Sequence, residues 1–202
     1  MRTITKTITT TTVIYNFNEL SDNAKEKVRE QYLNGQDAEC FYDDCMYRMN
    51  ELFPNSKLNI QFSLGYCQGD GFNIYGEISF SDLMENLKDK FTEKEKRFLE
   101  WAFRESGINS YTMRMNNHYC YCNAFLHEFT EDVFYELDYY RMKNIKKDIL
   151  DKFDTEARYY IGHICKEFEN DGYNYFYEVS DETLEDWVNI NEYEFTEDGN
   201  IY

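Results

Sequence analysis

Two runs of alternating apolar and polar residues lie near the centre of the chain: Leu58-Asn-Ile-Gln-Phe-Ser-Leu-Gly-Tyr66 and Phe72-Asn-Ile-Tyr-Gly-Glu-Ile-Ser-Phe80. The loop Cys67-Gln-Gly-Asp-Gly71 joins them. Because successive side chains of a strand point to opposite faces, this period of two is typical of strands with one buried face. The sequence therefore predicts an antiparallel hairpin over 58–66 and 72–80, with the even-numbered residues buried.

A second hairpin is predicted at 110–127, turning at Asn116-Asn117, since asparagine tolerates positive φ. A third, terminal hairpin is predicted around Asp198-Gly199. A long helix is expected over about 130–169, with a break near Asp154-Thr155 and a stop at Asn170-Asp171-Gly172. Hairpins followed by a long helix, without alternating strand and helix units, are typical of the α+β class.

Shorter helices are predicted from their N-terminal capping residues. Ser21-Asp22, Ser81-Asp82, Thr92-Glu93 and Ser180-Asp181 each combine a capping hydroxyl with an acid that favours the positive helix end. The length of 202 residues, the single proline and the absence of Gly/Ser-rich linkers predict one domain over 1–202.

Charge is the most informative feature of the composition. The chain has 39 acidic and 21 basic residues, which gives a net charge of −18. Nucleic-acid phosphates and anionic membranes would be repelled, so we expect neither as a direct partner. A basic protein surface is the natural partner, although acidity also serves solubility alone.

The acids are concentrated toward the C-terminus. Residues 166–202 contain twelve Asp and Glu but one Lys, and aromatic residues are interleaved with them. Carboxylates imitate phosphates, and exposed rings stack on arginine, so this composition suits a protein that covers a nucleic-acid-binding groove. The alternative is a solvated helix face over core aromatics. The candidate partner-binding residues here are Glu182, Glu185, Asp186, Glu192 and Glu194.

Gln68 and Asp70, in the loop of the central hairpin, are two further candidate partner-binding residues. A carboxylate held on a rigid hairpin suits a cation or an arginine of a partner. The alternative is a purely structural turn, in which Asp70 caps its own backbone.

The sequence assigns no catalytic residue, metal ligand or cofactor. The histidines form no HxH or HxxxH pair, and the six cysteines lack zinc-finger spacing. The chain has neither an apolar signal core at its N-terminus nor a run of roughly 20 apolar residues. We therefore expect a cytoplasmic protein with reduced thiols and without disulfides or zinc.

Four segments resemble an uncharacterised family of small proteins carried by phages and mobile elements of bacteria. They are Tyr15-Asn-Phe-Asn-Glu-Leu-Ser-Asp-Asn-Ala-Lys-Glu-Lys27, Ser63-Leu-Gly-Tyr-Cys-Gln-Gly-Asp-Gly-Phe72, His118-Tyr119 and Asn191-Glu-Tyr-Glu-Phe-Thr-Glu-Asp-Gly199. The resemblance implies a phage setting, in which acidic proteins of this size often inhibit host defences.

Charge and resemblance together predict a phage-encoded acidic binding protein. It would inhibit a host nucleic-acid-handling defence machine, such as a CRISPR effector or a restriction enzyme, by occupying a basic surface. Two alternatives stay open: a metal-dependent hydrolase that uses Asp70 and His118, and a phage structural or assembly factor. The oligomeric state is left open.

Overall fold

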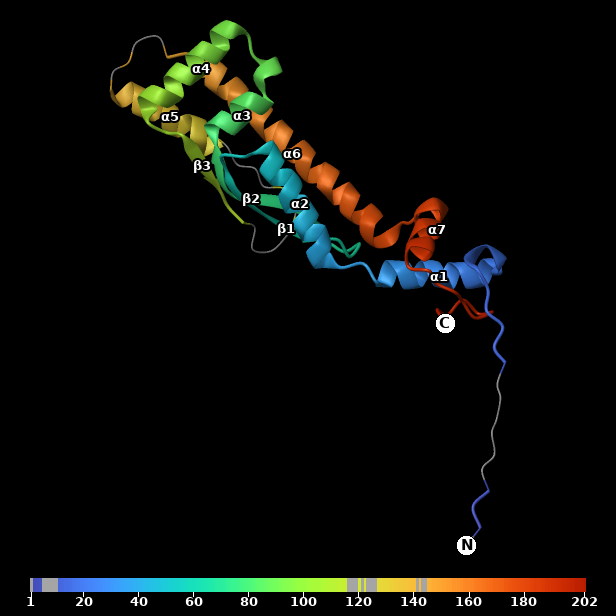
Figure 1. Cartoon of the computed structure of the whole chain (residues 1–202). Helices are drawn as coiled ribbons and strands as arrows, with labels where there is room; N and C mark the ends of the chain where they lie inside the picture. Colours follow the sequence, from blue (N-terminus) through green and yellow to red (C-terminus); the bar gives the residue numbers. More distant parts are fainter. Residues whose placement is uncertain are drawn as a thin grey trace. The chain divides into compact units, whose positions relative to one another are not determined.

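The computed structural model describes residues 2–4, 11–115, 120, 122, 127–140, 142 and 145–202, with only the backbone of 127–129. The chain divides into two compact units (Figure 1). Unit 1 comprises Met1–Asp37 and Asn174–Tyr202, and unit 2 comprises Ala38–Tyr173. The assignment of 1–202 to one domain stays a prediction, and each unit is described by itself.

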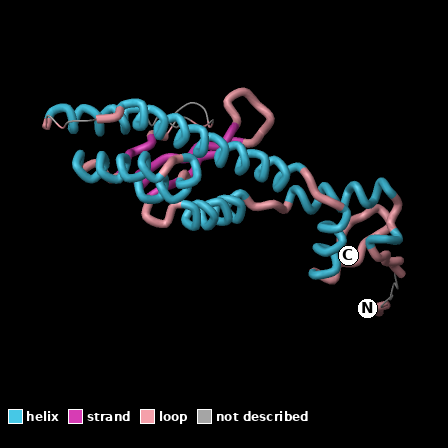
Figure 2. The backbone as a smooth tube through the Cα atoms, turned by 90° about the horizontal axis from the view of Figure 1, so that it is seen from above, coloured by secondary structure: helices cyan, strands magenta, loops and turns pink. Residues whose placement is uncertain are grey.

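Unit 2 contains an antiparallel sheet of order β1-β2-β3 in the described residues, formed by β1 (Lys57–Ser63), β2 (Gly71–Ser79) and β3 (Ser110–Met113). Figure 2 shows the strands lying side by side. Even-numbered residues face each other across β1 and β2, as in the pairs Ile60–Ile74 and Phe62–Phe72. Ile60, Ile74 and Phe72 are buried, which confirms the predicted hairpin and the buried face at its centre. The burial expected for Tyr66 is wrong, because β1 ends at Ser63 and the Tyr66 side chain is 69% exposed in the loop. The odd-numbered Asn73 is buried as well.

Among the described residues of unit 2, five helices accompany this sheet, including α6, which continues into unit 1. They are α2 (Ala38–Leu52), α3 (Phe80–Asn86), α4 (Glu93–Ser106), α5 (His127–Tyr139) and α6 (Lys147–Tyr177), with the short 3-10 helix η2 (Lys88–Lys90) before α4. Two of them pack aromatic rings on the even-numbered face. The Phe41 ring of α2 lies 5.2 Å from Phe62, and the Phe168 ring of α6 lies 5.2 Å from Phe72. The architecture confirms the α+β class.

The second predicted hairpin is only partly described. β3 pairs with β2, with Ile78 opposite Tyr111, a pairing that the sequence did not predict. The turn at Asn116-Asn117 and most of the expected return strand lie outside the described residues. His127, placed in that strand by the sequence pattern, instead begins α5.

The long helix predicted over 130–169 is two helices, because α5 ends at Tyr139 and α6 begins at Lys147. The break expected at Asp154-Thr155 is wrong. Asp154 is buried inside α6 and forms an ion pair of 2.7 Å with Arg158 one turn later, which supports a continuous helix.

The stop expected at Gly172 is also wrong, since α6 continues to Tyr177. A Cβ atom at Gly172 would lie 2.3 Å from Leu64 Cδ1 and 2.9 Å from Phe41 Cζ. The glycine therefore permits a close approach of α6 to α2 and to the hairpin loop, and its role is packing.

The capping predictions hold at three of the four sites. Ser21 and Ser180 accept hydrogen bonds from the N–H groups of Ala24 and Thr183, and Thr92 forms a capping box with Glu95. The fourth helix, α3, begins earlier than predicted and is capped by Ser79. Ser81, the expected cap, lies inside this helix, and the Asp82 carboxylate accepts hydrogen bonds from Asn55 and from the Ser56 hydroxyl.

Unit 1 packs α1 (Asp22–Asn34), α7 (Asp181–Ile190) and the 3-10 helix η1 (Phe17–Glu19) around one small core. The buried residues of this core are Phe17, Leu20, Ala24, Val28, Leu184, Val188 and Phe195. Phe195 pairs antiparallel with both Tyr15 and Ile201, which confirms the terminal hairpin. Gly199, at φ +80°, turns this hairpin against α1, where a Cβ atom would lie 2.4 Å from the Ala24 carbonyl oxygen.

In the described part of the chain, no helix combines the length and the apolar character needed to cross a membrane.

Candidate functional site

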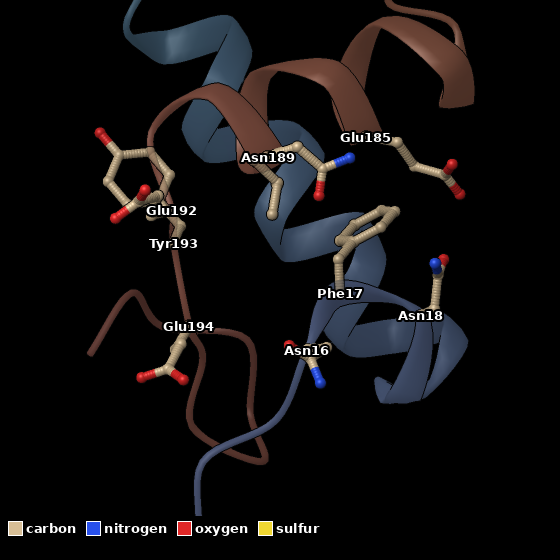
Figure 3. Close-up of a pocket in the computed structure, with 9 residues that line it drawn as sticks. Asn16, Phe17, Asn18, Glu185, Asn189, Glu192, Tyr193 and Glu194 are labelled. Atoms are coloured by element: carbon tan, nitrogen blue, oxygen red, sulfur yellow. The ribbon is translucent and has the colours of Figure 1, made fainter.

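Unit 1 contains a pocket of about 500 Å³ between α7, the segment after it and the η1 region (Figure 3). Phe17 and Val188, both buried core residues, form its apolar base. In Figure 3 the Phe17 ring points into the space between α7 and the segment that carries Asn16 and Asn18. The polar residues around this base are Glu185, Glu192, Glu194, Asn16, Asn18, Asn189 and Tyr193.

The turn after α7 brings the acids of the C-terminal segment back beside the helix. Glu192 adopts a left-handed conformation with φ +54°. The next N–H, of Tyr193, then bonds to the Val188 carbonyl at 3.1 Å, which is the six-residue closure of a Schellman motif. Two backbone hydrogen bonds between Tyr15 and Phe195, of 2.8 and 2.9 Å, fix Glu194 next to Asn16.

Arg29 and Lys27 pair with acids outside this pocket, whereas the Lys25 ammonium lies 5.5 Å from the centre of the Phe17 ring. Arg29 contacts Asp181 at 2.6 Å and Glu26 at 3.2 Å, and Lys27 contacts Asp198 at 3.3 Å. No Lys, Arg or His lines the pocket. Throughout the residues that the structure describes, no ion pair involves Glu185, Glu192 or Glu194. Three exposed carboxylates thus surround one apolar base.

The structure brings together three of the five acids predicted in this segment. Glu185, Glu192 and Glu194 line the pocket, whereas Glu182 and Asp186 are exposed on α7 outside its lining. Sequence reasoning missed the asparagines. The helical spacing of four between Glu185 and Asn189 signals that these two share a face. No sequence signal places Asn16 and Asn18 there, because they come from the other end of the chain.

In unit 2, the Asp70 carboxylate accepts hydrogen bonds from its own loop. The donors are the N–H groups of Gly65 at 2.6 Å and Cys67 at 2.8 Å, the Ser63 hydroxyl at 2.7 Å and the Cys67 thiol at 3.2 Å. The Tyr173 hydroxyl lies 3.5 Å away. Donation from the Cys67 N–H and the Ser63 hydroxyl lowers the pKa of Asp70 to about 2.

This geometry is the one expected if Asp70 serves a structural turn by capping its own backbone. The residue is the last one before β2, so it lies at the base of the loop, while Gln68 is exposed nearer its tip. The loop between β1 and β2 comprises residues 64–70, and its exposed aromatic residue is Tyr66, which the sequence pattern placed on the buried face of the first strand.

The histidine side chains that the structure describes do not take part in a metal site. His118 lies outside the described residues, as does the side chain of His127, and His163 on α6 is 3.5 Å from Glu167. Among the side chains that are described, no group of three or more His, Cys, Asp or Glu is placed to hold a metal ion.

Searches with protein-family models, among curated proteins and among solved structures found no match to this chain. The resemblance to the phage family therefore stays an expectation that rests on the four quoted segments.

Proposed function

We propose that this chain is an acidic binding protein whose unit 1 pocket accepts basic side chains of a partner protein. The supporting observation is the set of three carboxylates, Glu185, Glu192 and Glu194, around an apolar base that no basic residue lines. Lysine and arginine have apolar stems and charged heads, so a base of Phe17 and Val188 with a carboxylate rim matches both parts.

The partner class follows from charge. A net charge of −18 produces a field that speeds association with a basic protein and repels nucleic acid. Proteins that handle nucleic acid carry basic grooves, so the proposed partner is a host nucleic-acid-handling defence machine, such as a CRISPR effector or a restriction enzyme. In this proposal the chain is phage-encoded and inhibits by occupying that basic surface.

The experiment replaces the three pocket acids by Glu185→Lys, Glu192→Lys and Glu194→Lys in one variant. The matched control is Asp43→Lys, Asp89→Lys and Glu100→Lys, three exposed acids of unit 2 that change the net charge equally. Each protein is titrated into DNA-cleavage assays with a panel of restriction endonucleases and CRISPR nucleases. Association with an inhibited nuclease is then followed by stopped flow at low and at high salt.

We expect the unchanged chain to inhibit a nuclease at about one protein per target. The pocket variant should associate several-fold more slowly at low salt, with a much smaller difference at about 1 M salt, where screening acts within about 3 Å. The control variant should retain most of the rate. If both variants lost the association rate equally, the effect would be due to net charge rather than to the pocket. Inhibition at far below one protein per target would indicate an enzyme.

A further inference from the structure

Tyr66 in the hairpin loop of unit 2 combines an unfavourable backbone with an exposed ring. It adopts φ +56°, and among the described residues only Tyr66 and Glu192 are non-glycine residues with positive φ. Its side chain is 69% exposed, so the ring remains largely in water. Strain that brings little burial is typical of functional positions rather than of structural ones.

Hydrogen bonds on both sides of Tyr66 hold this conformation. The Asp70 carboxylate accepts the N–H groups of Gly65 and Cys67, the two neighbours of Tyr66. The Gly69 carbonyl accepts the N–H of Cys120 at 2.9 Å. Leu64, at the start of the loop, is buried beside Gly172 of α6. The loop is thus organised before any partner binds, which lowers the entropic cost of association.

A second ring supports Tyr66 from within unit 2. The ring centroid of Tyr173 on α6 lies 4.6 Å from that of Tyr66, with an interplanar angle of 31°. The Tyr173 hydroxyl is 3.5 Å from the Asp70 carboxylate. The exposed ring therefore belongs to a small surface that also contains a second aromatic ring and a negative charge.

An arginine of the same unit lies in a comparable environment within the fold. The Arg48 guanidinium lies 4.4 Å from the centre of the Phe168 ring, and the same side chain contacts the Asp171 carboxylate at 2.7 Å. An arginine is thus stacked on an aromatic ring beside an acid. Planar guanidinium groups favour this combination, whereas lysine acts as a compact, strongly hydrated charge.

We propose that Tyr66, supported by Tyr173 and Asp70, is a docking platform for an arginine side chain of a protein partner. The charge of the chain favours this occupant over a nucleobase, because an oligonucleotide would bring its phosphates against a net charge of −18. The proposal goes beyond the pocket of unit 1, since it places an arginine-selective contact in unit 2.

The test compares fluorescent hexa-arginine and hexa-lysine peptides, which carry the same charge. Affinities are measured by anisotropy at about 0.15 M salt for the unchanged chain, Tyr66→Ala, Tyr66→Phe and Tyr66→Asn. Asparagine tolerates the left-handed conformation, so Tyr66→Asn retains the loop backbone without the ring. Tyr159→Ala removes a tyrosine of α6 that is 70% exposed and serves as the matched control.

Tyr66→Ala and Tyr66→Asn should each weaken hexa-arginine binding about three- to tenfold, as expected for one stacked cation. Hexa-lysine binding should stay unchanged in both, and Tyr66→Phe and Tyr159→Ala should bind hexa-arginine like the unchanged chain. Thermal melts establish that each variant is folded.

The proposal would be overturned if Tyr66→Asn bound hexa-arginine with full affinity, or if the Tyr66 variants lost equal affinity for the two peptides. It would also be overturned if a single-stranded oligonucleotide, rather than the peptides, bound in a Tyr66-dependent way. The pocket variant of unit 1 should weaken both peptides alike. Failure at Tyr66 is therefore distinguishable from failure at the pocket.

Discussion

The hairpin loop of unit 2 and the turn after α7 in unit 1 both place an acid at or near a non-glycine residue with positive φ. In the hairpin loop, Asp70 accepts four hydrogen bonds from its own loop and holds Tyr66 in its conformation. In the turn, Glu192 itself has the positive φ, and its carboxylate lines a pocket beside those of Glu185 and Glu194. One acid stabilises a loop, and the others face an open surface.

This difference indicates that a carboxylate with several hydrogen-bond donors within reach stabilises its own loop, whereas one without such donors faces solvent. Two backbone N–H groups, a hydroxyl and a thiol donate to Asp70, so its oxygen atoms hold the loop together while the carboxylate keeps its negative charge beside Tyr66. None of the described residues that line the pocket of unit 1 is basic, so its three acids have no ion-pair partner among those lining residues.

The largest effect is expected from Gly172→Ala, which tests how firmly the hairpin loop is packed on α6. The added Cβ would lie 2.3 Å from Leu64 Cδ1, so we expect a loss of about 1–3 kcal/mol in the free energy of unfolding. Urea denaturation measures it. Gly162→Ala in the same helix meets no atom within 4 Å and should stabilise by about 0.5–1 kcal/mol. Equal behaviour of the two variants would show that the loop yields easily.

Acid titration separates the two regions next. The folded pKa of Asp70, about 2, lies below its ordinary value of 3.8. Its hydrogen bonds therefore stabilise the fold above about pH 4, and this contribution is lost as the pH falls through 2. Asp70→Asn should be less stable than the unchanged chain at neutral pH. Its free energy of unfolding should also decline less between pH 4 and pH 2. Urea denaturation monitored by circular dichroism at each pH measures both effects.

Glu95 provides the comparison for that experiment. Its pKa is also lowered to about 2, by the Thr92 N–H and by Lys152. Part of the decline in stability should therefore persist in Asp70→Asn and become smaller again when Glu95→Gln is added. An unchanged decline in Asp70→Asn would contradict the assigned role of Asp70.

Glu192→Gly should have the smallest effect on stability, and unlike Gly172→Ala and Asp70→Asn it should stabilise the fold. Glycine adopts φ +54° without strain, so we expect a gain of about 1 kcal/mol in thermal or urea unfolding. Asn191→Gly, at φ −92°, should bring no such gain. Because Glu192→Gly also removes a pocket carboxylate, it should weaken binding of hexa-lysine while it stabilises the fold. A variant that is both more stable and binds equally well would remove Glu192 from the binding surface.

Local patterns in the sequence were sufficient for much of the fold. The alternation identified the hairpin and the buried face at its centre, because the period of a strand is set by backbone geometry. It extended both strands too far, since Tyr66 lies in the loop and Phe80 begins α3. Ser21, Thr92 and Ser180 marked helix starts, because a cap bonds to an N–H group only three residues away.

Contacts between distant segments decided the rest. Gly172 has the sequence signature of a helix stop, yet it lies inside α6, since only a glycine lets Leu64 and Phe41 approach. Nothing local distinguishes Asp70 from Glu185, although the first is satisfied by its loop and the second is exposed at a pocket. Asn16 and Asn18 reach that pocket through the pairing of Tyr15 with Phe195. Composition alone determined that the chain is acidic, with a net charge of −18. Where its carboxylates are available depends on donors brought near by folding, and those come from positions far apart in the chain.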